Sequence, residues 1–151
     1  MLEVVILIGL QAAGKTTFSR QVLGGHEQVS KDHFPKARNR QRRQLRLIAD
    51  ALEAGRDVVV DNTNPSAEEW RPIVEVARAA GARVVGYWFA PDPVGSLERN
   101  ALRDAETRVP QVGMYATLKR LRQPVRDDGF DELFEVRFDG AGGFDLRGMG
   151  D

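Results

Sequence analysis

One element near the N-terminus matches the pattern G-x-x-x-x-G-K-[ST] without a break: Gly9, Leu10, Gln11, Ala12, Ala13, Gly14, Lys15 and Thr16. The apolar run Val4–Ile8 comes directly before it and is typical of a buried strand, and the residues that follow suit a helix. At this chain's composition, chance gives the pattern in on the order of one such chain in several hundred. A strand, a glycine-rich turn and a helix in this order predict a phosphate-binding loop (P-loop) in an α/β fold.

The residue types of this loop suit the phosphates of a nucleotide. Glycine lets the backbone curl around phosphate oxygens, and successive N–H groups at a helix N-terminus supply fixed positive charge. Lys15 then neutralises the β- and γ-phosphates, and Thr16 offers a hydroxyl to Mg²⁺. We therefore expect ATP and Mg²⁺ as cofactors and Lys15 as a catalytic residue. The alternative is a glycine turn without a ligand.

Apolar β-branched runs alternate with helical stretches along the rest of the chain. Strands are predicted at Val4–Ile8, Val58–Val60, Val84–Phe89 and Phe134–Phe138, with a short one near Gln28–Val29. Helices are predicted at Lys15–Leu23, Arg38–Ala54, Ser96–Ala101 and Val112–Arg122, and a further one from Ser66. This order predicts an α/β fold with a mainly parallel sheet of about five strands flanked by helices.

Five local patterns add detail to this prediction. Gly55 predicts the stop of the second helix, whose core stripe is expected at Leu45, Ile48, Ala49 and Leu52. Ser66–Glu69 predicts a capping box, and Pro72 predicts a broken first turn in the same helix. The glycine-rich tail Gly140–Asp151 is expected to be frayed.

Length and composition exclude several kinds of protein. A chain of 151 residues has the size of one domain, so a single domain over residues 1–151 is expected. The absence of cysteine and the presence of only two histidines exclude disulfides, thiolate nucleophiles and multi-histidine metal centres. The first apolar run is too short to span a membrane and carries Glu3 where a signal peptide would be basic. We expect a cytoplasmic protein without a membrane partner.

A P-loop does not by itself separate a switch, a motor and a kinase, but so short a chain favours a small phosphotransferase. The loop and further short motifs occur along the chain in this order: Gly9–Thr17, Val29–Asp32, Val58–Pro65, Arg99–Arg103, and Val109–Pro110 with Asp128–Phe130. Together they span nearly the whole chain. They resemble the P-loop kinase domain of polynucleotide 5′-hydroxyl kinases, within the adenylate-kinase-like P-loop phosphotransferases.

The resemblance implies roles for residues on both sides of the reacting phosphate. Thr17 joins the nucleotide-binding loop, and Asp32 takes the place of the carboxylate that accepts the proton of the acceptor hydroxyl as a general base. Arg103 takes the place of the arginine that clamps the donor phosphates, in a lid expected at about residues 100–109. Arg99 lies four residues earlier on a predicted helix, so both guanidinium groups are expected to face the phosphates. The alternatives are a capping or surface role for Asp32 and an exposed surface position for Arg99.

Three polar residues lie at the end of the second predicted central strand. Asp61 closes this buried strand, where a carboxylate can hold a magnesium-bound water or the Thr16 hydroxyl, although such carboxylates also cap turns. Asn62 and Asn64 follow at the edge where open α/β sheets bind their ligands. The resemblance places these two residues near the reacting phosphate or the acceptor.

Residues 31–46 hold seven cations and one acid, while the whole chain has zero formal charge. The expected helix presents several of these cations on one side, which favours a polyanionic acceptor, with Lys36, Arg42 and Arg43 as binding residues. A solvated helix face is the ordinary alternative. Pro35 stands where family members often carry an arginine that contacts the acceptor's phosphate, and Gln11 and Ala12 stand where better-known members have Pro and Gly.

These observations together favour an ATP- and Mg²⁺-dependent kinase whose acceptor is the 5′-hydroxyl of a nucleic-acid end. The alternatives are a kinase for a small molecule such as a nucleoside or a sugar, and a non-catalytic ATP-binding regulator. The oligomeric state does not follow from the sequence.

Overall fold

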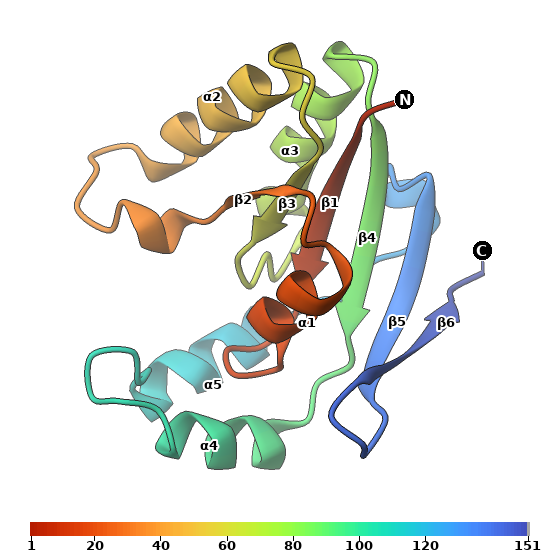
Figure 1. Cartoon of the computed structure of the whole chain (residues 1–151). Helices are drawn as coiled ribbons and strands as arrows, with labels where there is room; N and C mark the ends of the chain where they lie inside the picture. The colour runs from red at the N-terminus through yellow and green to blue at the C-terminus, as the bar shows by residue number, and fades with distance from the viewer. Residues whose placement is uncertain (151) are drawn as a thin grey trace.

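The computed structural model describes residues 1–150 and arranges six strands of that part of the chain in one sheet (Figure 1). The sheet order is β2-β3-β1-β4-β5-β6, and every pair is parallel except the antiparallel pair β5–β6. The strands are β1 Glu3–Ile8, β2 Glu27–Val29, β3 Val58–Asp61, β4 Arg83–Phe89, β5 Glu132–Phe138 and β6 Phe144–Gly148. The predicted α/β fold with a mainly parallel sheet is confirmed.

Five α-helices and two 3₁₀ turns complete the described chain. The helices are α1 Lys15–Val22, α2 Arg40–Glu53, α3 Ala67–Ala79, α4 Pro93–Ala101 and α5 Gln111–Arg120, and the turns are η1 Lys31–His33 and η2 Arg126–Asp128. None of the helices within residues 1–150 is long and apolar enough to cross a membrane.

The sheet is covered on both faces because its central strands are apolar on both. Val4, Ile6 and Ile8 of β1 pack with the buried faces of α2 and α3, whereas Val5 and Leu7 pack with Phe18 of α1. Alternate side chains of a strand point to opposite faces, so each face of the sheet receives its own helices. Burial of these side chains fixes the central strands beneath the loops that follow them.

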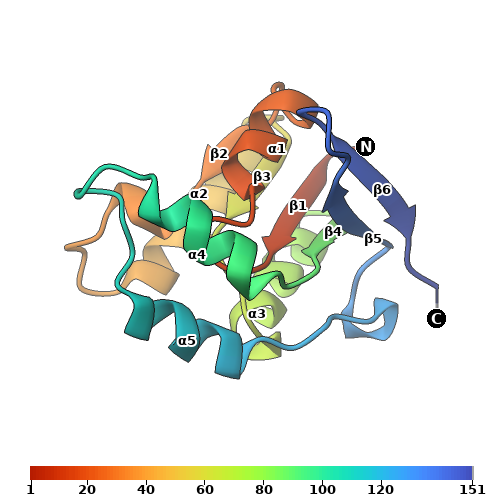
Figure 2. The same ribbon diagram turned by 90° about the horizontal axis from the view of Figure 1, so that it is seen from below.

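The carboxyl ends of β1, β3 and β4 lie at one edge of the sheet, because the three strands are parallel neighbours. The segments that follow these strands, together with α4 and α5, gather at this edge, as the view from below shows (Figure 2). Open α/β sheets bind their ligands at such an edge.

The expected core stripe of α2 is only partly correct. Ile48 and Leu52 are buried as predicted and Leu45 is partly buried, but Ala49 is exposed. Gln44 and Ala51 occupy the buried face instead. Gln44 is a polar side chain with no exposed surface, and its role lies in the functional site described below.

The start of α2 also differs from its prediction. The helix begins at Arg40 because Asn39 is its N-cap, accepting a hydrogen bond from the Arg42 backbone N–H at 3.0 Å. Its end matches, since Gly55 has φ +78° directly after the C-cap residue.

The predicted break and capping box at the start of α3 are both wrong. The helix runs without interruption through Pro72, and the Ser66 hydroxyl donates to the Glu69 carboxylate at 2.6 Å instead of accepting from a backbone N–H. Burial of Trp70, Ile73 and Val74 against the sheet offsets the lost hydrogen bond and the clash of a helical proline, about 3 kcal/mol.

The glycine-rich tail is not frayed as expected. Residues Phe144–Gly148 form β6, a sixth strand in register with β5, so the sheet has one strand more than predicted. Gly140 and Gly142 have positive φ in the turn between the two strands, and the Phe144 ring lies 5.2 Å from Phe18 and 5.3 Å from Phe138. Aromatic packing onto α1 therefore orders a segment whose composition alone favours a loose end.

Candidate active site

The loop between β1 and α1 has the shape that its glycines permit. Gly14 has φ +91° and caps the start of α1, and a Cβ at Gly9 would lie 2.8 Å from Phe89 Cβ. The backbone N–H of Gly9 donates to Thr63 O at 3.0 Å and so joins the loop to the segment after β3. The predicted succession of strand, turn and helix is present.

Lys15 is a buried cation at the start of α1. Its ammonium donates to Gly9 O at 3.0 Å and to Leu10 O, two carbonyls of the loop itself. The pKa of Lys15 is lowered to about 8, mainly by burial and in part by Arg103, while Asp61 and Asp32 oppose the shift. The loop therefore holds a cation that a bound anion would stabilise.

Thr16 and Asp61 meet across the edge of the sheet. The Thr16 hydroxyl donates to Asp61 Oδ2 at 2.8 Å, and Gln28 Nε2 donates to the same oxygen at 2.9 Å. A hydroxyl beside a carboxylate is an all-oxygen donor set, which fits Mg²⁺ with its water shell. No group of three or more His, Cys, Asp or Glu side chains suited to a metal occurs within residues 1–150, so a metal here would need further oxygens from phosphate and water.

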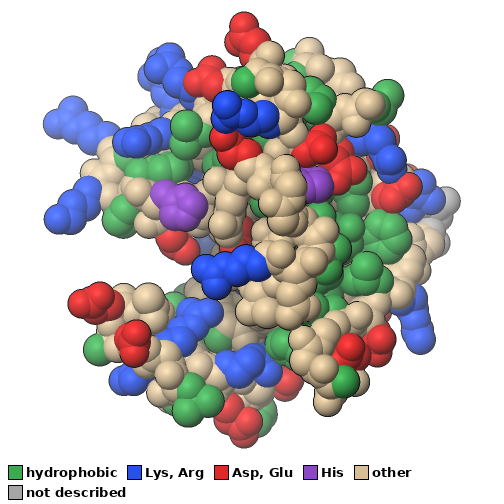
Figure 3. All heavy atoms as spheres, in the orientation of Figure 1, with side chains coloured by type: hydrophobic (Ala, Val, Ile, Leu, Met, Phe, Trp, Pro, Cys, Tyr) green, Lys and Arg blue, Asp and Glu red, His purple; other side chains and the backbone are tan. Residues whose placement is uncertain are grey.

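A cleft of about 1090 Å³ opens above these residues, visible as the notch on the left of Figure 3. Its upper rim belongs to η1 and the start of α2, and its lower rim to the segment between α4 and α5. The cleft brings together most of the residues singled out from the sequence: Gln11, Ala12, Gly14, Lys15, Thr16, Thr17, Asp32, Asp61, Asn62, Asn64 and Arg103.

Asp32 lies on the rim of this cleft, in the short turn η1. Ser30 caps the turn by accepting from the Asp32 backbone N–H at 3.2 Å. The carboxylate itself is 89 % exposed, and its nearest cation is Arg40 at 3.9 Å. The Asp32 side chain is therefore free to meet an incoming group.

The two asparagines predicted to touch ligands make internal contacts. Asn62 Oδ1 accepts from the Lys31 backbone N–H at 2.9 Å, and Asn62 Nδ2 donates to Gln44 Oε1 at 2.6 Å. Asn64 is 2 % exposed, has φ +43° and donates to Leu7 O at 2.8 Å. Asn62 thus fixes the turn that carries Asp32, and Asn64 fixes the end of β1.

Arg99 and Arg103, predicted to face the phosphates together, do not share a helix face. Helix α4 ends at Ala101, so Arg103 lies in the following loop, where it lines the cleft. Arg99 turns the other way: its Nε donates to Ala12 O at 2.6 Å, and its guanidinium lies 4.6 Å from the centre of the Phe138 ring. The predicted common helix face is wrong because α4 ends between the two residues, and a contact of Arg99 with the phosphates stays a prediction.

The cations that line the cleft are not the ones singled out from the basic run. Lys36, Arg42 and Arg43 are exposed and do not line it, and Arg43 lies over the Phe34 ring at 4.8 Å. Four other cations line the cleft: Arg20, and a group made of Lys31, Arg40 and Arg120, of which Arg40 lies 3.9 Å from Asp32. Arg40 belongs to the same basic run, but nothing in the sequence near Arg120 indicated this position.

Lys31, Arg40 and Arg120 are crowded together. Burial lowers the pKa of Lys31, and the positive charges of Arg40 and Arg120 lower it further, with Glu69 opposing. Arg120 forms an ion pair with Glu69, while Arg40 Nε is buried and has no hydrogen-bond partner. Within residues 1–150, no carboxylate forms an ion pair with Lys31. An anion in this part of the cleft would relieve the repulsion.

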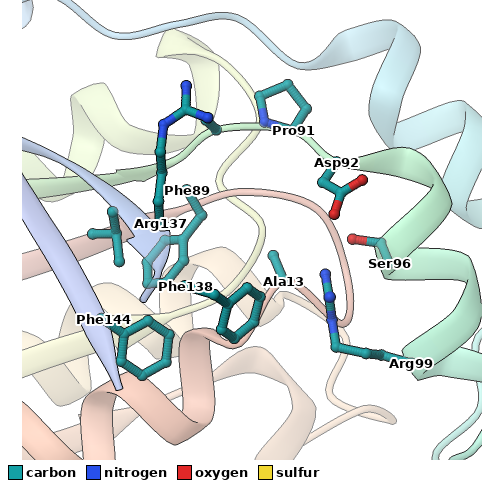
Figure 4. Close-up of a pocket in the computed structure, with 11 residues that line it drawn as sticks. Ala13, Phe89, Pro91, Asp92, Ser96, Arg99, Arg137, Phe138 and Phe144 are labelled. Atoms are coloured by element: carbon teal, nitrogen blue, oxygen red, sulfur yellow. The ribbon is translucent and has the colours of Figure 1, made fainter. Parts of the chain in front are cut away.

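A second, smaller pocket of about 300 Å³ lies on the other side of the P-loop (Figure 4). The rings of Phe89, Phe138 and Phe144 form one side, and Asp92, Ser96 and Arg99 lie on the other. The Ser96 hydroxyl is buried and has no hydrogen-bond partner. Aromatic faces beside a buried hydroxyl without a partner suit a flat heteroaromatic ring. Of the residues that line this pocket, only Ala13 and Arg99 were predicted from the sequence to be site residues.

Comparison with known proteins agrees with this geometry. The family model described as AAA domain matches residues 4–126. A bifunctional polynucleotide phosphatase/kinase of Schizosaccharomyces pombe is 25 % identical over 141 residues, covering 90 % of this chain and 34 % of that protein. The chain thus spans about a third of the length of that relative.

Solved structures share the fold at lower identity. A fungal RNA kinase superposes with a TM-score of 0.69 at 17 % identity, covering 90 % of this chain and 74 % of that one. A gluconokinase from Sinorhizobium meliloti superposes with a TM-score of 0.61 at 16 % identity, covering 88 % and 82 %. With the P-loop in place and the family model matching most of its length, the chain belongs to the AAA domain family.

Proposed function

We propose that this protein is an ATP- and Mg²⁺-dependent kinase that phosphorylates the 5′-hydroxyl of a nucleic-acid end. The observation that carries the proposal is one cleft with Lys15, Thr16 and Asp61 on one side and Asp32 among three cations on the other. The similarity to a polynucleotide phosphatase/kinase supports this choice of acceptor.

On the donor side, the P-loop binds the triphosphate. The Lys15 ammonium leaves the carbonyls of Gly9 and Leu10 for the β- and γ-phosphates, which stabilise its charge. Thr16 and Asp61 would hold Mg²⁺, which when bound neutralises charge on the same phosphates. The base of the nucleotide enters the aromatic pocket, where the buried Ser96 hydroxyl gains a partner.

On the acceptor side, Asp32 acts as the general base. The Asp32 carboxylate takes the proton of the acceptor hydroxyl while the hydroxyl oxygen forms a bond to the γ-phosphorus. The bond from that phosphorus to the β–γ bridging oxygen breaks, which releases ADP. Arg103 stabilises the charge that develops on the transferred group, because it lines the cleft and acts electrostatically on Lys15.

The acceptor's own phosphate fits the cation group next to Asp32. Lys31, Arg40 and Arg120 supply the positive charge that Pro35, which also lines the cleft, cannot supply. Charge-assisted hydrogen bonds from arginine to phosphate are short and directional, so they orient the hydroxyl toward the general base. The exposed cations Lys36, Arg42 and Arg43 lie outside the cleft, where a longer strand would pass.

An acceptor screen with γ-labelled ATP tests this function directly. Purified protein is offered oligonucleotides with a 5′-hydroxyl, nucleosides and sugars, and label is expected on the oligonucleotides. Label on nucleosides or sugars alone would establish the small-molecule alternative. Label on none, with ATP bound, would favour the non-catalytic regulator.

Asp32→Asn provides the matched test of mechanism. The variant keeps the shape of the side chain and loses the base, so transfer is expected to fall by about 10²–10⁴-fold with nucleotide affinity retained. A variant that keeps full activity would remove Asp32 from the mechanism.

A further inference from the structure

Ala12, in the middle of the P-loop, has a backbone conformation that alanine adopts at a cost. Its φ is +56°, and Ala12 and Asn64 are the only non-glycine residues with positive φ among residues 1–150. The side chain is 5 % exposed, so the residue is packed in this conformation. A left-handed alanine is strained where glycine would not be, and it persists only if its surroundings hold it.

Arg99 is the side chain that holds it. Its Nε donates to Ala12 O at 2.6 Å across 87 positions of sequence. The guanidinium is braced from behind by the Phe138 ring at 4.6 Å, and that ring also abuts the loop, since a Cβ at Gly14 would lie 2.8 Å from Phe138 Cζ. Arg99 therefore lies between the loop and the β5–β6 hairpin (Figure 4).

The neighbouring loop residue is tied in a similar way to a second helix. Gln11 Nε2 donates to Thr117 Oγ1 at 2.9 Å, and that hydroxyl donates to Gly113 O at 3.1 Å within α5. Two consecutive P-loop residues are thus held by α4 and α5, the helices on either side of the segment with Arg103.

We propose that Arg99 is a positioning residue that keeps the P-loop in its phosphate-binding shape through the Ala12 carbonyl, and that it is not a clamp on the phosphates. Without this hydrogen bond, the strained alanine relaxes and the loop binds a triphosphate less tightly. The proposal rests on the donor-binding part of the proposed function and is independent of the acceptor.

Two substitutions separate positioning from direct charge. Arg99→Ala removes the donor, and Arg99→Gln keeps a donor nitrogen at the same distance along the side chain as Nε while removing the charge. Binding of tripolyphosphate with Mg²⁺, measured by calorimetry, avoids any contribution from the base. Loss of one charged hydrogen bond should weaken tripolyphosphate binding roughly tenfold in Arg99→Ala, while Arg99→Gln stays within about threefold of the original chain.

Ala12→Gly supplies the second test, since glycine adopts this φ without strain. In an Ala12→Gly background, Arg99→Ala should cost about threefold or less in tripolyphosphate affinity, because the loop no longer depends on the hydrogen bond. Arg71→Ala, on the exposed side of α3, is the matched control and should leave affinity and melting temperature unchanged.

Three results would overturn the positioning role. If Arg99→Gln binds tripolyphosphate as weakly as Arg99→Ala does, the charge of Arg99 contacts the phosphate directly. An effect on ATP without an effect on tripolyphosphate would make Arg99 a contact of the base. If Arg99→Ala loses the same tripolyphosphate affinity in the original chain as in the Ala12→Gly background, backbone strain at this position does not explain the effect. Failure of the original chain itself to bind tripolyphosphate would instead contradict the donor site of the proposed function.

Discussion

The Thr16 hydroxyl donates a hydrogen bond to Asp61 Oδ2 at 2.8 Å, although 45 positions separate the two residues. The contact joins the first turn of α1 to the last residue of β3, and it exists because β1 and β3 are adjacent parallel strands that end at the same edge. Whatever binds Thr16 in this protein is therefore within reach of the Asp61 carboxylate.

Asp61→Asn removes the negative charge of this side chain but keeps an oxygen that can accept from Thr16 and Gln28. We expect the Mg²⁺ concentration for half-maximal transfer to rise by about 10–100-fold, as for groups that orient metal ligands. Titration of activity with Mg²⁺ at saturating ATP measures this shift. An unchanged Mg²⁺ requirement would place the metal elsewhere.

The pKa of Lys15 predicts that nucleotide affinity falls in alkaline solution. The free protein has a Lys15 pKa of about 8, and bound phosphate favours the charged ammonium, so binding above this pH must take up a proton. The dissociation constant for ATP should be nearly level below pH 8 and then rise by up to about tenfold per pH unit. Calorimetry in buffers of different ionisation enthalpy detects the proton directly, and Lys15→Ala should show neither proton uptake nor the break near pH 8.

Lys15 has the opposite effect on folding. Its pKa is lower in the folded chain than the ordinary value of 10.5, so between about pH 8 and 10.5 the unfolded chain binds more protons. The contribution of Lys15 to the free energy of unfolding therefore increases with pH across that window. In urea unfolding without nucleotide, the free energy of unfolding of Lys15→Ala should exceed that of the original chain most below pH 8. The same pH dependence in both chains would contradict the lowered pKa.

Arg40 and Arg42 lie two positions apart on α2 but have different surroundings. Arg40 lines the cleft beside Asp32, whereas Arg42 is exposed outside it. Arg40→Gln should raise the KM for acceptors that carry a phosphate by roughly tenfold, the worth of one charge-assisted hydrogen bond, with kcat less affected. Arg42→Gln should leave a short acceptor unaffected and reduce the salt dependence of binding a long one by about one phosphate contact. Steady-state kinetics at two salt concentrations separates them, and equal effects would disprove the assignment.

Gly86 in β4 has no room for a side chain. A Cβ at this position would lie 2.7 Å from Leu133 Cδ1 and from Phe130 Cδ1, both in the buried core. Gly86→Ala should lower the free energy of unfolding by about 1–3 kcal/mol, the usual cost of overpacking. Urea unfolding measures it against Gly25→Ala, where a Cβ meets nothing within 4 Å and the change should stay small. A stable Gly86→Ala chain would mean that β5 shifts to make room.

Local sequence patterns predicted correctly those elements whose secondary structure depends mainly on their own residues. The P-loop and the central strands were predicted at the correct residues, because each is recognised from a glycine pattern or an apolar run within a few consecutive residues. Helix ends were less well predicted, and the core stripe of α2 was partly wrong because Gln44 is buried as the partner of Asn62, a residue 18 positions away. The prediction of a frayed tail failed because the tail is ordered by pairing with β5 and by packing on Phe18. Both are contacts between distant parts of the chain, which a local pattern does not show.

The sequence by itself determined the P-loop and the α/β class, since each depends on residue type and short spacing, and its resemblance to a kinase family made Asp32 and Arg103 candidates. Only the tertiary structure decided which cations enter the cleft and where Arg99 points. Helix α4 ends before Arg103, and Arg120 approaches Lys31 and Arg40 from another helix, so these positions follow from how helices pack on the sheet. Helix packing depends on many weak contacts between segments that are distant in the sequence, so a local sequence pattern does not predict it.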